Sequence, residues 1–197
     1  MTVPEQPRRA DARRNVEGIR RAALDVFRTG GLTTPLDEVA RAAGVSKGTI
    51  YHRFGSRRGL IDAVVDDLVA ERIQGIIAAV GELDEPLARF EEYLLRMFLL
   101  QYDEPAANDV LVRALPDSEP LLNLCEKAQE FAFGLLRAAQ EAGVIRPDLT
   151  PDDVNHLILE RGAIVRSCGC TQSRADYQRR LRFLLDGLRS NPFPRTS

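Results

Sequence analysis

A short polar segment, GVSKGTIYHRF at residues 44–54, carries six side chains that can bind a phosphate group or a base edge. Its hydroxyl, ammonium, imidazole and guanidinium groups are the kinds that contact the backbone and bases of nucleic acids. The segment shows almost none of the residue pairing that catalysis requires. It therefore favours binding to a polyanion. The six side chains are those of Ser46, Lys47, Thr49, Tyr51, His52 and Arg53.

Two short helices must hold this surface in place. Thr34 suits the N-cap of the first helix, Pro35 suits its first position, and Gly44 supplies a sharp exit. Ser46 suits the N-cap of the second helix. Two short helices joined by the turn sequence AAGVS indicate a helix-turn-helix, whose second helix presents its N-terminal residues to the major groove of DNA.

Each residue type on the second helix has a specific use in that interpretation. Gly48 has no side chain and lets the backbone and DNA approach closely, while Lys47 and Thr49 can donate to phosphates or bases. Residues 51–53 can clamp the sugar–phosphate backbone, and the free N–H groups near Ser46 form an anion site. The alternative is an ordinary solvated helix face in a protein that never touches DNA.

The charge distribution favours the DNA interpretation. Residues 1–62 hold 12 Lys and Arg against seven Asp and Glu, whereas residues 63–197 hold 15 against 22. A basic N-terminal part and an acidic remainder of the chain suggest that only the N-terminal part contacts a polyanion. The alternative is that the charges are distributed by chance. The 197-residue chain has no apolar run of about 20 residues and no signal-like N-terminus. Three cysteines suggest a reducing compartment, so we expect a cytoplasmic protein.

The fold that we expect is all-α, with nine helices and no strand, because apolar residues recur at helical spacing and never alternate convincingly. We expect a flexible basic arm at 1–12, a three-helix helix-turn-helix domain at 13–58, and a C-terminal helical ligand-binding and dimerisation domain at 59–197. The predicted helices span approximately 13–29, 35–43, 47–54, 57–81, 85–101, 106–115, 119–142, 151–168 and 173–189.

Residues 13–62 resemble the DNA-binding domain of the TetR/AcrR family of transcriptional regulators. The motif AGVSKGTIYxxF at residues 43–54 carries most of the resemblance, supported by IxxAAxxxF at 19–27 and by Thr34 with Val39-Ala40. The remainder is similar only in helix count and in the segment 141–148, which leads into a capped helix. The resemblance implies a homodimeric regulator, usually a repressor, that a small molecule releases from a palindromic operator.

With that resemblance, we assign ten residues to DNA binding. The family pattern is not matched everywhere: Pro35 replaces a common hydroxyl residue, Arg53 often has a histidine counterpart, and Gly59 weakens the start of the fourth helix. The sequence does not distinguish repression from activation. The assigned residues are Thr34, Ser46, Lys47, Gly48, Thr49, Tyr51, His52, Arg53, Ser56 and Arg57.

The C-terminal helices offer soft side chains for a small-molecule pocket, with plain hydrophobic core as the alternative. Arg161 falls in the middle of an apolar helix face, where it needs an acidic partner or an anionic ligand. Its possible partners are Glu91, Glu92 and Glu126. The residues that we assign to ligand binding are Phe90, Tyr93, Met97, Cys125 and Arg161.

The last two predicted helices suit a four-helix contact between two copies. The residues assigned to this contact are Gly162, Tyr177, Leu181, Leu184 and Leu188. Cys168 and Cys170 raise the alternative of a thiol sensor. The chain has only two histidines and no second pair of metal ligands to join Cys168 and Cys170, so we expect no metal and no cofactor.

Two other functions compete with DNA binding. One is a helical protein that senses a small molecule or a thiol without DNA. The other is a Cys-dependent enzyme using Cys125 and His156, although the sequence lacks the familiar nucleophile, phosphate-loop, zinc and dinucleotide motifs. We therefore predict that the protein is not an enzyme.

Overall fold

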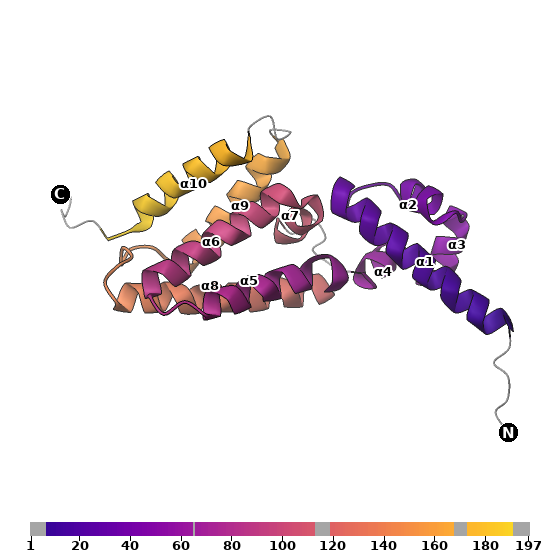
Figure 1. The fold of residues 1–197 in the computed structure, drawn as a ribbon, viewed down its shortest axis with the longest axis horizontal. Coiled ribbons are helices and arrows are strands. Elements are labelled where there is room, and N and C mark those ends of the chain that lie inside the picture. The colour runs from indigo at the N-terminus through magenta and orange to yellow at the C-terminus, as the bar shows by residue number, and fades with distance from the viewer. Residues whose placement is uncertain (1–6, 65, 113–118, 168–172, 191–197) are drawn as a thin grey trace, which may run out of the picture.

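The structure is a computed structural model that describes residues 7–64, 66–112, 119–167 and 173–190, without the side chains of 7–13, 66, 68 and 121. Those ranges contain ten α-helices, one π-helical segment and one isolated β-bridge, between Ile145 and Arg189, but no strand. The all-α prediction is confirmed, with one more α-helix than the nine expected. Figure 1 shows two helical bodies joined end to end.

The first body is a three-helix unit with a short fourth helix. Its core is formed by fully buried Ile19 and Phe27 of α1, Val39 of α2, Ile50 of α3 and Leu60 of α4. The helix-turn-helix predicted from the sequence is therefore present. The elements are α1 (Pro7–Gly30), α2 (Leu36–Ala43), α3 (Lys47–Phe54) and α4 (Arg57–Asp62).

Two predicted helix starts in this body need correction. Helix α1 begins at Pro7, so residues 7–12 of the predicted arm belong to the helix, and residues 1–6 lie outside the described ranges. The N-cap of α2 is Pro35 and has no side-chain capping bond, because the Thr34 hydroxyl turns back and donates to the carbonyl of Gly31 over 2.9 Å.

The predicted fourth helix, 57–81, is interrupted. It divides into α4, the π-helical segment η1 (Asp66–Ala70) and α5 (Glu71–Gly81). No glycine or proline between residues 60 and 70 signals this break. Its partner is α1: the Arg20 guanidinium binds the Asp67 carboxylate at 3.2 Å, and Arg28 donates to the Asp67 carbonyl at 3.0 Å. The π-type turn widens the helix locally. Its residue Asp67 is the one that contacts α1, so we attribute the break to packing against α1.

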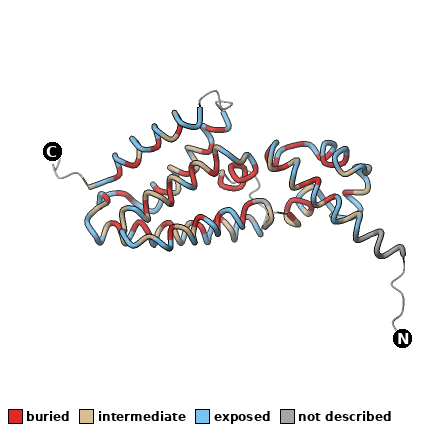
Figure 2. The backbone as a smooth tube through the Cα atoms, viewed as in Figure 1, coloured by how far each residue is buried: buried red, intermediate tan, exposed pale blue. Residues whose placement is uncertain are grey.

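The second body surrounds a central helix. Helix α6 packs against α5, α8, α9 and α10, and most of its inward side is fully buried (Figure 2). The predicted helix at 106–115 is α7 and ends at Leu111, with residues 113–118 outside the described ranges. The elements are α6 (Pro86–Asp103), α7 (Pro105–Leu111), α8 (Glu119–Glu141), α9 (Pro151–Ser167) and α10 (Arg174–Leu188).

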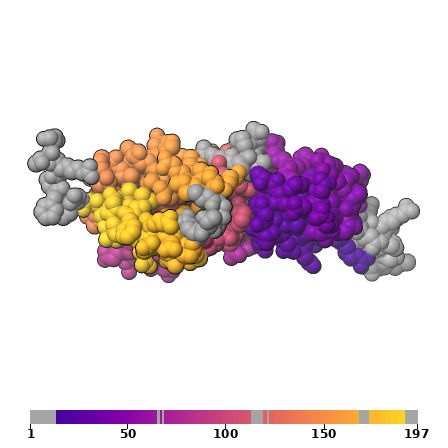
Figure 3. Space-filling view, turned by 90° about the horizontal axis from the view of Figure 1, so that it is seen from above, coloured from indigo at the N-terminus to yellow at the C-terminus, as the bar shows by residue number. Residues whose placement is uncertain are grey.

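The two bodies meet where the C-terminal end of α1 packs against α7 and η1. The space-filling view shows them in direct contact along this junction (Figure 3). Helix α3 lies on the side of the first body that is away from α7 (Figure 1). The C-terminal helices therefore hold the helix-turn-helix in a defined position without covering α3.

Candidate nucleic-acid interface

The turn between α2 and α3 is set by backbone geometry. Gly44 adopts a left-handed conformation with φ of 66°, which glycine reaches without steric cost. The N–H of Val45 donates to the Ala40 carbonyl at 3.0 Å, and that of Gly44 to Arg41 at 3.2 Å, which closes α2. This closure lets α3 leave α2 at a sharp angle.

The start of α3 is capped as the sequence predicted. The hydroxyl of Ser46 accepts a hydrogen bond from the Thr49 N–H at 3.1 Å, and the two hydroxyls hydrogen-bond at 2.9 Å. Ile50 is fully buried and anchors the inner side of the helix. The large aromatic side chain of Tyr51 is 44% exposed, and His52 and Arg53 are exposed beside it. An inward anchor and an outward polar face are what a recognition helix requires.

Lys47 has an acidic partner that the sequence reasoning missed. Its ammonium group lies 2.9 Å from the carboxylate of Asp37 in the first turn of α2. The hydrogen bond to Asp37 raises the pKa of Lys47 above its ordinary value, and the charge attraction between the two groups adds a smaller effect in the same direction. Both side chains are exposed, so solvent weakens the pair and Lys47 can exchange Asp37 for a phosphate.

Two of the ten assigned residues, Thr34 and Arg57, direct their polar groups into the protein. Thr34 is only 8% exposed, and its hydroxyl is bound to Gly31. Arg57 turns inward, donates to the Leu32 carbonyl, and lies 5.7 Å above the Phe27 ring. Burial lowers the pKa of Arg57.

Ser56 is exposed, and its hydroxyl caps α4 by accepting the Gly59 N–H at 2.9 Å, as the hydroxyl of Ser46 caps α3. The other seven assigned residues lie together on α3 and its N-cap. The candidate interface is therefore this single face, residues 46–53 without Ile50.

The residues assigned to ligand binding separate into two groups. Tyr93, Met97 and Cys125 line one cavity between α6, α8 and α9, but its volume is only about 20 Å³. The Tyr93 hydroxyl donates to the Ala128 carbonyl at 2.8 Å, and burial raises the pKa of Tyr93 well above its ordinary value. Phe90 is fully buried and does not line this cavity.

Arg161 is half-buried and does not line that cavity either, and its Nε atom is buried with no hydrogen-bond partner among the residues that the structure describes. Two of its predicted partners are engaged elsewhere: Glu91 binds Arg189 and Glu92 binds Arg96, each at 2.6 Å.

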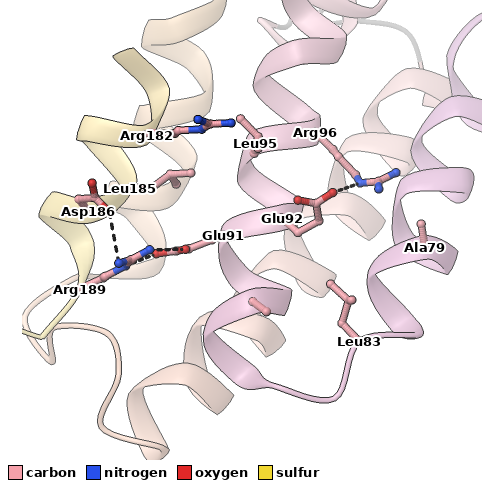
Figure 4. Close-up of a pocket in the computed structure, with 11 residues that line it drawn as sticks. Ala79, Leu83, Glu91, Glu92, Leu95, Arg96, Arg182, Leu185, Asp186 and Arg189 are labelled. Carbon is pink, nitrogen blue, oxygen red and sulfur yellow. Dashed lines mark hydrogen bonds and ion pairs between the residues drawn. The ribbon is translucent and has the colours of Figure 1, made fainter. Parts of the chain in front are cut away.

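An open groove of about 510 Å³, which the sequence did not predict, lies on the second body. It extends over α6 between α5 and α10 (Figure 4). Its carboxylates are occupied, because Figure 4 shows Glu91 and Glu92 each directed at an arginine, and Asp186 lies 3.3 Å from Arg189. The groove therefore carries paired charges over an apolar base, and no one charge dominates it.

The residues assigned to dimerisation mostly pack within the chain. Tyr177, Leu181 and Leu188 are less than 9% exposed. The Tyr177 ring stacks on Tyr102 of α6 at 4.9 Å. Gly162 is buried against α7, where its carbonyl accepts a hydrogen bond from Asn108 at 3.1 Å.

Leu184 is half-buried. The large apolar side chains that α9 and α10 leave exposed are Ile164, at 39%, and Phe183, at 67%.

Two further predictions concern sulfur and metal chemistry. Cys168 and Cys170 lie outside the described residues, whereas Cys125 is buried and its thiol lies 3.7 Å from the Val110 carbonyl. Among the residues that the structure describes, no group of three His, Cys, Asp or Glu side chains is placed to hold a metal ion. No helix in the same ranges is long and apolar enough to cross a membrane.

Comparison with known proteins extends over both bodies. Residues 19–64 match the family described as bacterial regulatory proteins, tetR family, and residues 85–190 match the C-terminal domain described as transcriptional regulator SbtR-like. The chain is 34% identical over 137 residues to the HTH-type transcriptional regulatory protein RaaS of Mycobacterium tuberculosis. That alignment covers 68% of this chain and 60% of RaaS, so the chain spans less than two thirds of this relative.

Solved structures show the same fold. The TetR transcriptional regulator SCO0520 from Streptomyces coelicolor has a TM-score of 0.55 and 28% identity, covering 89% of this chain and 99% of that chain. The ketosteroid transcriptional regulator KstR2 of Mycobacterium tuberculosis has a TM-score of 0.62 and 20% identity, and the alignment covers 96% of this chain and 98% of the KstR2 chain. The fold and site define a helix-turn-helix protein with an all-helical C-terminal domain. The chain belongs to the TetR family of regulatory proteins, as its motif at residues 43–54 predicted.

Proposed function

We propose that this protein is a DNA-binding transcriptional repressor, in which two copies present α3 to the half-sites of a palindromic operator. The observation that carries the proposal is the polar face of α3, exposed at Lys47 and at residues 51–53 and anchored from behind by Ile50. The first 62 residues carry an excess of five positive charges, which suits contact with phosphates. The major groove admits a helix of this kind.

The second copy binds through α9 and α10 in this proposal. Ile164 and Phe183 are the large apolar side chains that these helices leave exposed, and a symmetric contact would bury both. Tyr177, Leu181 and Leu188 support that surface from inside, since they fix α10 on α6. Two-fold symmetry then spaces the recognition helices about one turn of DNA apart, roughly 34 Å.

A small molecule releases the protein from DNA by opening the cavity at Tyr93, Met97 and Cys125. That cavity has about 20 Å³ of free volume, which suffices for one water molecule, whereas ligand pockets usually measure ~300 Å³ or more. An effector that binds there must separate α6, α8 and α9. Because α6 leads into α7, and α7 packs on α1, this movement reaches the DNA-binding body.

A Cys-dependent enzyme is disfavoured by the positions of the two residues that it needs. Cys125 lines the closed cavity, whereas His156 is exposed beside Asp153 and Glu160 in a different surface hollow. The Nδ1 atom of His156 is bonded to the Asp152 carbonyl at 2.7 Å. We therefore propose that the protein acts by binding and not by catalysis.

The test is selection of bound sequences from random duplex DNA, followed by affinity measurements over a salt series. The chain has two lysines, which supply a matched pair of variants, Lys47→Ala and Lys127→Ala. Lys127 is exposed on α8, far along the chain from the interface. A lost phosphate contact reduces the slope of log K against log salt by about 0.9, hence about 1.8 for a dimer.

We expect the wild-type protein to enrich a palindrome. We expect the slope of log K against log salt to become shallower in Lys47→Ala and to stay unchanged in Lys127→Ala. A failure to enrich any sequence both with and without a candidate effector, or equal slopes in the two variants, would refute the assignment of α3 as the DNA-reading helix. Adding a candidate effector to the same assay then separates a repressor that is released from DNA from a protein that requires the effector to bind.

A further inference from the structure

The contact between the two bodies centres on one buried carboxylate. Asp109 of α7 is only 5% exposed. One of its oxygens accepts a hydrogen bond from the backbone N–H of Leu32, in the turn between α1 and α2, at 2.5 Å. Its other oxygen pairs with the guanidinium of Arg166 on α9. Asp109 therefore links the DNA-binding body to two helices of the C-terminal body.

The peptide units of Leu32 are held from both bodies. The N–H of Leu32 is bound by Asp109, and its carbonyl accepts a hydrogen bond from Arg57 at the start of α4. Arg57 is also fixed by the Phe27 ring below it. A displacement of Asp109 is therefore passed through one residue to the helix that follows the recognition helix.

The local sequence is shaped for this carboxylate. Gly31 has a φ of 79°, and a Cβ atom there would lie 2.6 Å from the Asp109 carboxylate, so the approach requires glycine. The Gly31 carbonyl accepts hydrogen bonds from the N–H and the hydroxyl of Thr34, at 3.3 Å and 2.9 Å. Thr34, which the sequence assigned to DNA, thus completes the turn that Asp109 holds.

The contact also has room to change. A cavity of about 270 Å³ lies at this junction, lined from the first body by Gly31 and Thr33 and from the second by Tyr102, Asp109 and Arg166. The two ions of the pair are unequally buried, since the Arg166 side chain is 43% exposed and that of Asp109 only 6%. Arg166 is the penultimate residue of α9, so its position follows any movement of that helix.

We propose that Asp109 is a positioning residue that transmits movement of α9 to the DNA-binding body through the Leu32 peptide. A buried carboxylate is stable there only while its counter-ion is in place. When α9 withdraws Arg166, the carboxylate gains from hydration in the adjoining cavity and leaves the Leu32 N–H. The inference rests on the proposed function for its consequence, which is a loss of the fixed spacing between two recognition helices.

The first experiment measures hydrogen exchange of the Leu32 amide in the full-length protein. Arg166→Gln removes the counter-ion, Asp109→Ala removes the acceptor, and Arg174→Gln is the control, since it breaks an exposed arginine pair with Asp103 elsewhere. We expect exchange at Leu32 to accelerate about 10-fold or more in the first two variants and to stay unchanged in the third. Unchanged exchange in Arg166→Gln would overturn the proposal, even if Asp109→Ala fails to fold.

The second experiment measures affinity for operators whose half-sites are moved apart or together by one or two base pairs, and for a single half-site. We expect Arg166→Gln to lose about 10-fold at the preferred spacing, to tolerate altered spacings better than the wild type, and to bind a single half-site equally well. If Arg166→Gln accelerates exchange at the Leu32 amide but leaves the preferred half-site spacing unchanged, the contact only holds the two bodies together. That result would refute the proposal that Asp109 positions the DNA-binding body. If the wild type binds no DNA, the proposed function fails, and the exchange experiment still decides whether Arg166 controls the Leu32 contact.

Discussion

Replacing Gly59 with alanine sets helix propensity against steric contact. Gly59 lies inside α4, where alanine is ordinarily favoured over glycine by about 0.5–1 kcal/mol. A Cβ atom on Gly59, however, would overlap the backbone carbonyl of Phe54 at the end of α3. A backbone oxygen cannot rotate away as a flexible side chain would, so α3 and α4 would have to separate.

The steric cost of the added methyl group is expected to exceed the gain in helix propensity. Forcing an extra methyl group into a packed site costs roughly 1–3 kcal/mol, which exceeds the propensity gain. We expect Gly59→Ala to destabilise the protein by about 1–2 kcal/mol. The matched control is Gly75→Ala in α5, where no described residue outside the helix lies within 4 Å of the added atom, and we expect stabilisation by about 0.5–1 kcal/mol.

Thermal unfolding of both variants at one fixed protein concentration tests this reasoning. For a chain of this size each kcal/mol shifts Tm by roughly 2–4 °C, so the two variants should shift Tm in opposite directions. Because Gly59 also sets how α4 meets α3, we expect Gly59→Ala to weaken DNA binding while Gly75→Ala leaves it unchanged. A Gly59→Ala protein that is as stable as Gly75→Ala would refute the steric argument.

Three further substitutions probe the cap, the core and the turn, each by urea unfolding at constant protein concentration. Ser46→Ala should cost about 1 kcal/mol, because the Thr49 N–H loses its acceptor at the start of α3, and no change in midpoint would contradict the cap. Tyr93→Phe should cost about 0.5–1.5 kcal/mol through the lost bond to Ala128, without a change in m-value. Gly31→Ala should cost at least about 1 kcal/mol, since its positive φ and the nearby carboxylate both oppose a side chain; a stabilised variant would exclude that geometry.

Local signals in the sequence predicted the helix-turn-helix well. The cap at Ser46, the left-handed Gly44 and the buried Ile50 each depend on residues within one or two turns, and the structure shows all three. A helix boundary of this kind is decided by neighbouring residues, so it can be read directly from the chain. The AGVSKGTIY motif added the family because it combines these local requirements in one order.

Arg57 and Thr34 could not be placed from sequence, because long-range contacts decide their direction. Arg57 follows the cap of α4 and would suit a phosphate contact, yet the Leu32 carbonyl and the Phe27 ring draw it inward. The turn at Gly31 captures the hydroxyl of Thr34. Both side chains have polar ends that suit DNA and protein partners alike, so residue type alone does not distinguish the two.

The apolar stripe of α10 illustrates a different limit. Tyr177, Leu181 and Leu188 have the spacing of a packing face, and the sequence correctly indicates that they are buried. We assigned the stripe to a contact between two copies, but its spacing alone does not distinguish a second copy from α6 of the same chain, because both surfaces are apolar. The structure assigns the stripe to α6, and this leaves Phe183 on the opposite side for any contact with another molecule.

Helix α1 is held by the C-terminal side of the chain at two separate places. Near the break in the fourth predicted helix, Arg20 and Arg28 bind the side chain and the carbonyl of Asp67. At the end of α1, Asp109 binds the backbone of Leu32. A rigid helix fixed at two points cannot rotate against the C-terminal body unless one contact yields. The half-buried Asp67 pair is partly weakened by solvent, whereas the Asp109 carboxylate is buried, so we infer that the Asp109 contact holds α1 in place until Arg166 is withdrawn.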